Sequence, residues 1–296
     1  MSKISDLSLS DYFERLSYTE TFQKQLSVID MGNIPDLDAG RKNYPMRLKA
    51  YSLLLVLAGE IKLGINYDLK ILTGNTIMQL SPNDIIEHTA YSSDFKGYLI
   101  ICSAGLRAEM LSMTASIQLQ KAEQLKYIHP MQRLTEEQKS HLIIQVELIK
   151  KYIADKAHLH YDIVIKNQVI NLFLDIDSIR WSKYGDGEIQ PSRNEILRWK
   201  FRELLVQNCR QHRDVGFYAD KLCVTADHLS RVVREFDRQS AGKWITNAVI
   251  TEAKILLRKP DKTINQIAQD LNFPDQSTFG KFFKRNIGVS PLEYRK

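Results

Sequence analysis

The sequence predicts an α+β protein in two parts, a small β domain with covering helices followed by an all-helical domain. Three observations support this. Residues 44–103 hold short apolar runs between turn residues, residues 134–184 repeat apolar residues at helical spacing, and residues 218–296 resemble themselves at an offset of 50. Short, closely spaced strands are typical of a sandwich or barrel, and two aligned helical copies indicate a duplicated unit.

The strands of the first part are expected between clusters of turn-forming residues. Gly, Asn and Pro at 58–60, 73–75 and 81–84 favour the backbone angles of turns. The expected strands are therefore 51–58, 61–67, 76–80, 85–86 and 98–102.

Residues 134–184 predict two amphipathic helices joined by a short connection. Apolar residues such as Leu142, Val146 and Ile149, and later Ile165 and Val169, recur at helical spacing. One apolar stripe can cover the β domain. A second either completes the internal core or pairs with another subunit, so a homodimer is expected and the internal alternative stays open.

A polar segment rich in Gly and Pro separates these helices from the last part of the chain. Gly185, Gly187 and Pro191 lie in it, and such composition is typical of linkers. We expect residues 1–184 to form a β domain with dimerisation helices, 185–194 a linker, and 195–296 a helical domain.

Charge and composition narrow the class of function. The net charge is +6, and residues 195–296 hold 19 Lys and Arg against 12 Asp and Glu. A basic domain attracts polyanions, so nucleic acid is the leading partner class. There is no membrane-spanning apolar run and no signal-peptide core at the first residues. Three scattered cysteines, Cys102, Cys209 and Cys223, indicate a reducing compartment and are expected to be buried apolar residues. A cytoplasmic protein is expected.

Each copy of the repeat predicts two short helices with a tight turn between them. Leu229 aligns with Phe279 and Trp244 with Tyr294 at the offset of 50. In the first copy, Thr225 is a suitable N-cap for a helix running to about residue 237. In the second copy, Asn272 marks the turn, Asp275 caps the second helix and Gly288 ends it. Phe279, Phe282, Phe283 and Trp244 are expected in the core.

A pair of helices with this geometry suits double-stranded DNA, because a major groove admits one α-helix whose first residues meet base edges. The exposed early residues of each second helix are the candidates for base contacts. Arg231 and Lys281 can donate to guanine, and Gln276 can pair with adenine. The base-edge candidates are Asp227, Ser230, Arg231, Gln276, Ser277 and Lys281. The phosphate candidates are Thr225, Arg234, Lys284 and Arg285.

The same residues resemble a known family. The segments 271–273, 277–285 and 288–295, and the joining helix from Trp244 to Leu257, closely match the signature of AraC-type transcription regulators. The resemblance covers roughly residues 200–296 and implies two helix-turn-helix units that enter successive major grooves. Arg238, Ala241, Val249 and Gly280 depart from the family pattern, which affects the exact contact list and not the expected fold.

The resemblance also implies a cupin-like front domain that binds a small-molecule effector, with RNA polymerase as a further partner. A metal-dependent cupin enzyme fused to a DNA-binding domain is the main alternative, but it needs clustered ligands. The β region offers His88 with Glu87 adjacent, and His158 and His160 lie between the helices. No common catalytic motif occurs, so no enzyme, cofactor or metal is expected. A regulator that takes no effector is the second alternative.

Overall fold

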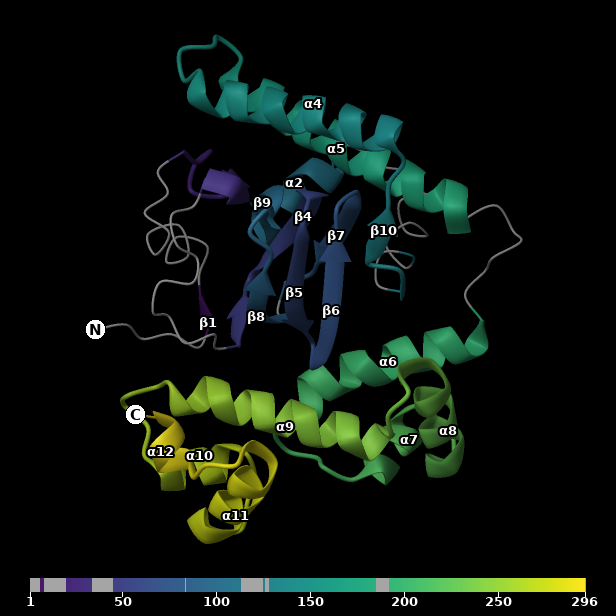
Figure 1. The fold of residues 1–296 in the computed structure, drawn as a ribbon, viewed down its shortest axis with the longest axis vertical. Helices are drawn as coiled ribbons and strands as arrows, with labels where there is room; N and C mark the ends of the chain where they lie inside the picture. The colour runs from purple at the N-terminus through teal and green to yellow at the C-terminus, as the bar shows by residue number, and fades with distance from the viewer. Residues whose placement is uncertain are drawn as a thin grey trace.

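A computed structural model describes residues 6–7, 20–33, 45–82, 84–112, 125, 128–184 and 192–295. Figure 1 shows the strands in the middle of the molecule, two long helices across one side of them, and the C-terminal helices on the opposite side. The predicted linker lies largely outside the described residues. The mixed α and β composition is as predicted.

The strands form two five-stranded sheets that do not close on themselves. Neighbouring strands are antiparallel, except that β1 runs parallel to β3. The first sheet contains, in order, β1 (Asp6–Leu7), β3 (Met46–Leu48), β8 (Ile85–Tyr91), β5 (Glu60–Ile65) and β6 (Asp68–Thr73). The second contains β10 (Met131–Arg133), β7 (Thr76–Leu80), β4 (Ala50–Ala58), β9 (Lys96–Ser103) and β2 (Leu26–Asp30).

Apolar side chains fill the space between the two sheets. Leu54 and Val56 of β4 meet Ile61 and Leu63 of β5 in one buried cluster. Alternate residues of a strand point to opposite faces, so β4 also sends Leu53 to the other side of its sheet. This arrangement is a sandwich, and the described strands do not close into the barrel that was the other expectation.

The predicted strand positions were correct for β4, β7 and β9 to within two residues at each end. The expected strand 61–67 was too long, since β5 ends at Ile65. Asn66 and Tyr67 have positive φ of 46° and 75° and form a two-residue hairpin turn. Sequence inspection took Tyr67 for a strand residue because aromatic side chains favour strands. It also missed β1, β2, β3, β6 and β10 and ended β8 too early.

Three helices follow the strands in the N-terminal part. They are α2 (Ala104–Ser112), α4 (Glu136–Ala154) and α5 (Tyr161–Tyr184), and a short 3-10 helix spans Met31–Asn33. Thr135 and Gln138 form a reciprocal capping box at the start of α4. The apolar stripes of α4 and α5 bury Leu142, Val146 and Ile165 against the outer face of the second sheet. The two helices predicted in 134–184 are thus present and cover the sheet.

The C-terminal part consists of helices grouped around one core. They are α6 (Arg193–Asn208), α7 (Val215–Lys221), α8 (Ala226–Asp237), α9 (Ala241–Leu257), α10 (Ile264–Asp270), α11 (Gln276–Ile287) and α12 (Pro291–Arg295). Ser192 and Glu195 form a capping box that starts α6 at Arg193. Helical structure therefore begins two residues before the predicted boundary at 195.

The cysteines follow the expectation in two cases of three. Cys102 and Cys209 are buried, whereas Cys223 is exposed. The prediction for Cys223 was wrong because it occupies the turn between α7 and α8 with a positive φ of 55°. No helix among the described residues is long and apolar enough to cross a membrane.

Candidate nucleic-acid interface

The helix α8 has one face in the core and one in solvent. The Thr225 side chain accepts a hydrogen bond from the backbone N–H of His228 at 3.1 Å and begins the helix where predicted. Leu229, Val232 and Val233 are buried. The opposite face is left to solvent, as binding in a DNA groove requires.

The helix α11 repeats this arrangement. The Asp275 carboxylate accepts a hydrogen bond from the backbone N–H of Thr278 at 2.7 Å, which lowers the pKa of Asp275. Asn272 has φ of 54° in the preceding turn, and Gly288 has φ of 92° at the end. Phe279 and Phe283 are buried, whereas Phe282, predicted in the core, is half-buried against it.

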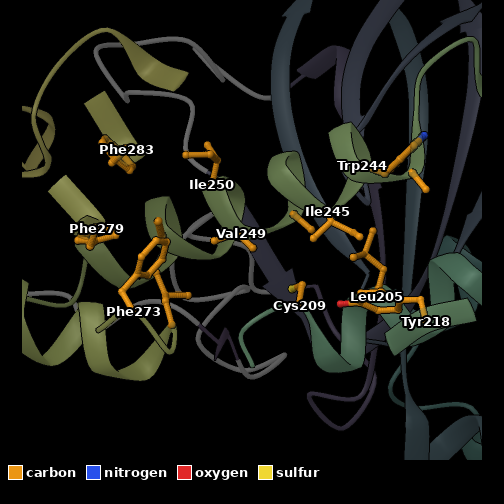
Figure 2. Packing of buried hydrophobic residues seen from close by; sticks show 14 of the residues in the cluster. Leu205, Cys209, Tyr218, Trp244, Ile245, Val249, Ile250, Phe273, Phe279 and Phe283 are labelled. Atoms are coloured by element: carbon orange, nitrogen blue, oxygen red, sulfur yellow. The ribbon is translucent and has the colours of Figure 1, made fainter. Parts of the chain in front are cut away.

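Helix α9 holds together the two helix pairs, the first formed by α7 and α8 and the second by α10 and α11. Trp244, Ile245 and Val249 of α9 belong to a cluster that includes Tyr218 from the first pair and Phe279 from the second. Figure 2 shows α9 passing between these two groups of side chains. A single core of this kind places both pairs on one rigid helix.

All ten predicted DNA-contact residues lie on the solvent side of the helix pairs. Ser230 is half-exposed, and the others are exposed: Thr225, Asp227, Arg231, Arg234, Gln276, Ser277, Lys281, Lys284 and Arg285. Asp227, Ser230, Arg231 and Arg234, together with Glu235, line an open hollow along α8. The structure therefore presents the predicted residues on accessible surface.

Sequence inspection missed two residues beside this surface. The Arg231 guanidinium lies 3.0 Å from Nδ1 of His228, one turn earlier on α8, which limits where Arg231 points. The three-residue spacing could have revealed this pair. Arg213 lies before α7 and bonds to the turn between α10 and α11, 58 residues away, so no local pattern could indicate it.

The exposed faces of the two second helices differ in charge. Helix α8 exposes Asp227 and Glu235 beside Arg231 and Arg234, which balance. Helix α11 exposes Lys281, Lys284 and Arg285 and no carboxylate. Electrostatic attraction to phosphates is therefore concentrated on the second pair.

The first sheet contacts α6 and α9 on the side away from the second helices α8 and α11 (Figure 1). Glu252 of α9 has a side chain only 1% exposed and pairs with Arg47 of β3 and with Arg210, which lies just after the end of α6. Lys254 of α9 pairs with Glu87 of β8 at 3.1 Å. Several ion pairs thus join the two parts of the chain.

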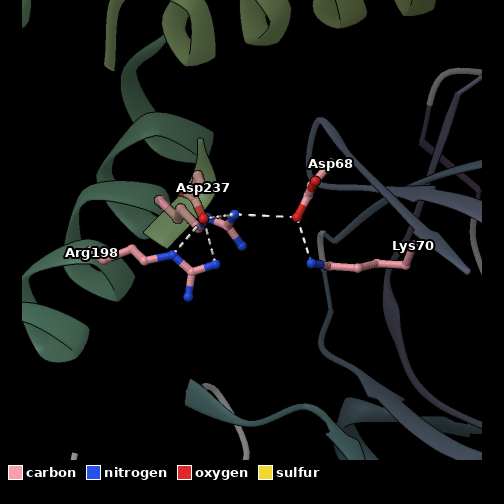
Figure 3. A network of polar contacts seen from close by, with 5 residues as sticks. Asp68, Lys70, Arg198 and Asp237 are labelled. Carbon is pink, nitrogen blue, oxygen red and sulfur yellow. Dashed lines mark hydrogen bonds and ion pairs between the residues drawn. The ribbon is translucent and has the colours of Figure 1, made fainter. Parts of the chain in front are cut away.

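A second group of ion pairs extends to the end of α8. Arg202 of α6 pairs with Asp68 of β6 and with Asp237 of α8. Figure 3 shows these two carboxylates within one network of polar contacts. Arg202 lies 3.3 Å from the Asp68 carboxylate and 2.9 Å from that of Asp237. Arg198 also pairs with Asp237, at 2.6 Å. The carboxylate at the end of α8 is therefore held by two arginines of α6.

The structure also bears on the alternative function, that of a metal-dependent cupin enzyme. Among the described residues, no group of three His, Cys, Asp or Glu side chains could hold a metal ion. Glu87, considered with His88 from the sequence, pairs with Lys254 instead. The side chain of His88 lies outside the described part.

Comparisons with known proteins place the C-terminal segment. Residues 218–296 match the model of a helix-turn-helix domain. The chain is 31% identical over 84 residues to the arabinose operon regulatory protein of Salmonella typhimurium, covering 28% of this chain and 30% of that protein. It is 24% identical over 206 residues to the raffinose operon regulator RafR of Pediococcus pentosaceus, covering 68% of each. The solved structure of ToxT from Vibrio cholerae aligns over 92% of this chain and 97% of ToxT, with TM-score 0.42 and 14% identity.

Residues 218–296 are thus a helix-turn-helix domain, the class of domain with which transcription regulators bind DNA. This domain is similar to that of AraC-type regulators, such as the arabinose operon regulatory protein.

Proposed function

We propose that the protein is a sequence-specific DNA-binding transcription regulator in which both helix pairs read DNA. The observation that carries this proposal is the common design of α8 and α11. Each begins at a capped, exposed N-terminus and buries its opposite face in a core shared through α9. Residues at the start of such a helix meet base edges, and later basic residues meet phosphates. A regulator of this kind acts in the cytoplasm.

The ten residues divide by their place on the helices. We assign base contacts to Asp227, Ser230 and Arg231 on α8, and to Gln276, Ser277 and Lys281 on α11. Thr225 and Arg234 of the first pair, and Lys284 and Arg285 of the second, contact phosphates. Asp227 has the acceptor chemistry that suits the amino group of cytosine.

Selection of bound sequences from a randomised duplex pool tests this proposal. Enrichment of two short motifs about one helical turn apart is the expected result. Retention without any enriched sequence would show a non-specific basic protein. Arg231→Ala or Lys281→Ala should relax preference at one base position, at about 1–3 kcal/mol. Arg234→Ala is the matched variant, which should weaken binding to every sequence and reduce the salt dependence.

We also propose that a small-molecule effector controls the protein through the N-terminal part. A groove of about 270 Å³ lies where β5, β6 and β8 face α9, lined by Gly64, Asp68, Leu69, Lys243 and Lys254, among others. Its volume is slightly below the usual range of about 300–1,000 Å³ for ligand sites, and its walls come from both parts of the chain. Occupancy would therefore affect how the parts meet.

Thermal denaturation with a panel of candidate metabolites tests the effector. A rise in Tm that depends on concentration would support it. No rise with any compound, together with DNA binding unaffected by cell extract, would favour the regulator that takes no effector. We propose binding and not catalysis as the role of the N-terminal part, in place of the cupin-type enzyme.

A homodimer is the third element of the proposal. Apolar residues are exposed on the helices that cover the second sheet, among them Ile144 on α4 and Ile163 and Leu174 on α5. Exposed apolar patches on such helices are typical of subunit interfaces. Through its DNA-bound units the dimer would recruit or block RNA polymerase.

A further inference from the structure

The two helix pairs contact each other directly, without passing through α9. Arg213, in the loop between α6 and α7, donates hydrogen bonds to the carbonyl of Leu271 at 2.8 Å and to the carbonyl of Asn272 at 2.7 Å. The side-chain amide of Asn272 donates in return to the carbonyl of Gln211 at 2.9 Å. We call these four residues the inter-pair clasp.

The chemistry of the clasp requires an arginine. Leu271 is the C-cap of α10, where carbonyls lack helical partners and the helix dipole is negative. A planar guanidinium can donate to two neighbouring carbonyls at once, whereas an ammonium is a single point. The guanidinium of Arg213 also lies 4.0 Å from the centre of the Phe273 ring, and this contact fixes its plane.

Phe273 connects the clasp to the second helix of the second pair. Its ring centre lies 5.4 Å from that of Phe279 and 5.1 Å from that of Phe282, both on α11. A displacement of Arg213 would therefore shift the Phe273 ring and, through it, α11, the helix that carries Lys281. The clasp joins the first pair to the base-reading helix of the second through packed side chains.

The clasp is a specific device and not a by-product of the repeat. At the repeat offset of 49 residues, Lys262 occupies the place of Arg213. Lys262 instead pairs with Asp270 inside its own helix pair. The equivalent residue of the second pair, Lys262, thus bonds within its own pair, whereas Arg213 bonds to the other pair.

A second link between the pairs has a mechanical consequence. Helix α9 joins them through one junction at each end, and Arg238 at the first junction is left-handed with φ of 55°. Both pairs also pack against α9 in one shared core, which already limits how far each pair can turn about its junction. The clasp closes a ring formed by α7, α8, α9, α10 and the connecting loops, and this ring further limits the rotation.

We propose that Arg213 is a positioning residue that fixes the angle between α8 and α11, and thereby the spacing of the two DNA motifs that the protein accepts. This inference rests on the proposed function, in which both helices read DNA. Inserting one base pair moves one motif by about 3.4 Å and turns it by about 35° around the duplex. A clasped protein cannot follow such a shift, whereas an unclasped one can.

The test uses the full chain and duplexes that carry the two selected motifs at the preferred spacing, one base pair closer and one base pair further apart. Affinities are measured at one salt concentration for wild type, Arg213→Ala, Arg213→Lys and Asn272→Gly. Glycine is chosen at 272 because it keeps the positive φ while removing the amide donor. Cys223→Gly is the matched control, since Cys223 holds the equivalent turn position in the first pair, outside the clasp.

Wild type and Cys223→Gly should lose on the order of tenfold in affinity for either shifted duplex, because one set of base contacts is lost. Arg213→Ala and Asn272→Gly should bind all three duplexes within about threefold of each other, with Arg213→Lys between, because one donor replaces two. Equal losses on all three duplexes, or an unchanged spacing profile in folded Arg213→Ala, would overturn the positioning role. A wild type that selects no motif would instead overturn the proposed function.

Discussion

The hydroxyl of Tyr67 lies 3.7 Å from the sulfur of Cys209, although the two residues belong to different parts of the chain. Tyr67 is at the tip of the β5–β6 hairpin, and its ring packs against the core of the C-terminal helices. Cys209 is the C-cap of α6. A tyrosine with a φ of 75° is strained by about 1–3 kcal/mol, so packing contacts must hold it in place.

The Tyr67→Gly variant should separate the effect of backbone strain at residue 67 from the effect of the ring contact with Cys209. Glycine accepts the positive φ and suits the turn, but it removes the ring that covers Cys209. Burial raises the pKa of the Cys209 thiol to about 12, so reaction with a thiol reagent is slow while the parts are docked. We expect faster modification of Cys209 in the variant, measured by mass spectrometry in a Cys223→Ser background because Cys223 is exposed.

Asn75→Gly is the control for this experiment. Asn75 also has positive φ, of 63°, but lies in the turn between β6 and β7 and bonds to Glu136. It should leave the modification rate of Cys209 unchanged. Equal rates in wild type and Tyr67→Gly would show that the hairpin does not shield Cys209.

Removal of the Glu252 carboxylate should destabilise the protein strongly. Glu252→Ala leaves Arg47 and Arg210 without the anion that both contact. Breaking a buried ion pair costs about 3–5 kcal/mol, and the partial exposure of the arginines places the expected loss near the lower value. The free energy of unfolding, from urea denaturation, measures it.

Lys150→Ala provides the comparison on the surface. Lys150 pairs with Glu147 on α4 at 2.9 Å, with both side chains partly exposed. Pairs of this kind contribute about 0–1 kcal/mol. A Glu252→Ala variant as stable as Lys150→Ala would contradict the central place assigned to Glu252.

Two glycines of the second pair should respond to alanine in opposite directions. Gly280 lies inside α11, and a Cβ there would meet nothing within 4 Å. Gly280→Ala should therefore stabilise the protein by about 0.5–1 kcal/mol, because alanine loses less backbone entropy in a helix. Gly288→Ala should destabilise it, since the φ of 92° is unfavourable for alanine. Thermal denaturation measures both effects. A fall in Tm for Gly280→Ala would contradict the open space that the structure shows around a Cβ at residue 280.

The cap at Asp275 should make stability depend on pH. Hydrogen bonds from Thr278 lower the pKa of Asp275 below its ordinary value, so the folded state favours the carboxylate. The stabilisation is fully present above the unfolded pKa of about 3.9 and is lost as pH falls through the lower folded pKa. Asp275→Ala should be less stable than wild type at pH 7, and the difference should shrink in acid.

Asp275→Asn serves as the matched variant here. Asparagine caps helices well but does not titrate, so it should keep much of the neutral stability. Urea denaturation from pH 7 down to pH 3 gives the comparison. A difference between wild type and Asp275→Ala that stays constant over this range would exclude the carboxylate as its cause.

Charge on the outer face of α5 should disrupt the proposed dimer. Ile163 and Leu174 are exposed and lie about three turns apart on one side of the helix. Sedimentation of Ile163→Lys should show a monomer if this face joins two subunits, because a buried unpaired charge is costly. Leu159→Lys is the control in the loop before α5, where the residue is 88% exposed. A wild type that sediments as a monomer would contradict the dimer.

Several features followed from the sequence alone because their causes are local. Thr225 and Asp275 were predicted as caps, and Asn272 and Gly288 at positions of positive φ, since side chains and φ preferences act within a few residues. The exposed face of α8 followed from helical periodicity for the same reason. The sequence analysis missed the whole of β6, in which Leu69 and Ile71 are exposed and only Leu72 is buried.

Only the tertiary structure decided how the parts meet. Arg213 reaches Leu271, Tyr67 reaches Cys209, and Arg202 joins Asp68 to Asp237, across separations of 35 to 142 residues. None of these side chains lies in a local sequence pattern that indicates its distant partner. Such contacts depend on the packing of whole sheets and helices, whose relative positions are set by burial over many residues at once. The amino-acid sequence therefore determined the helix pairs and their exposed faces, and the fold determined what holds them in place.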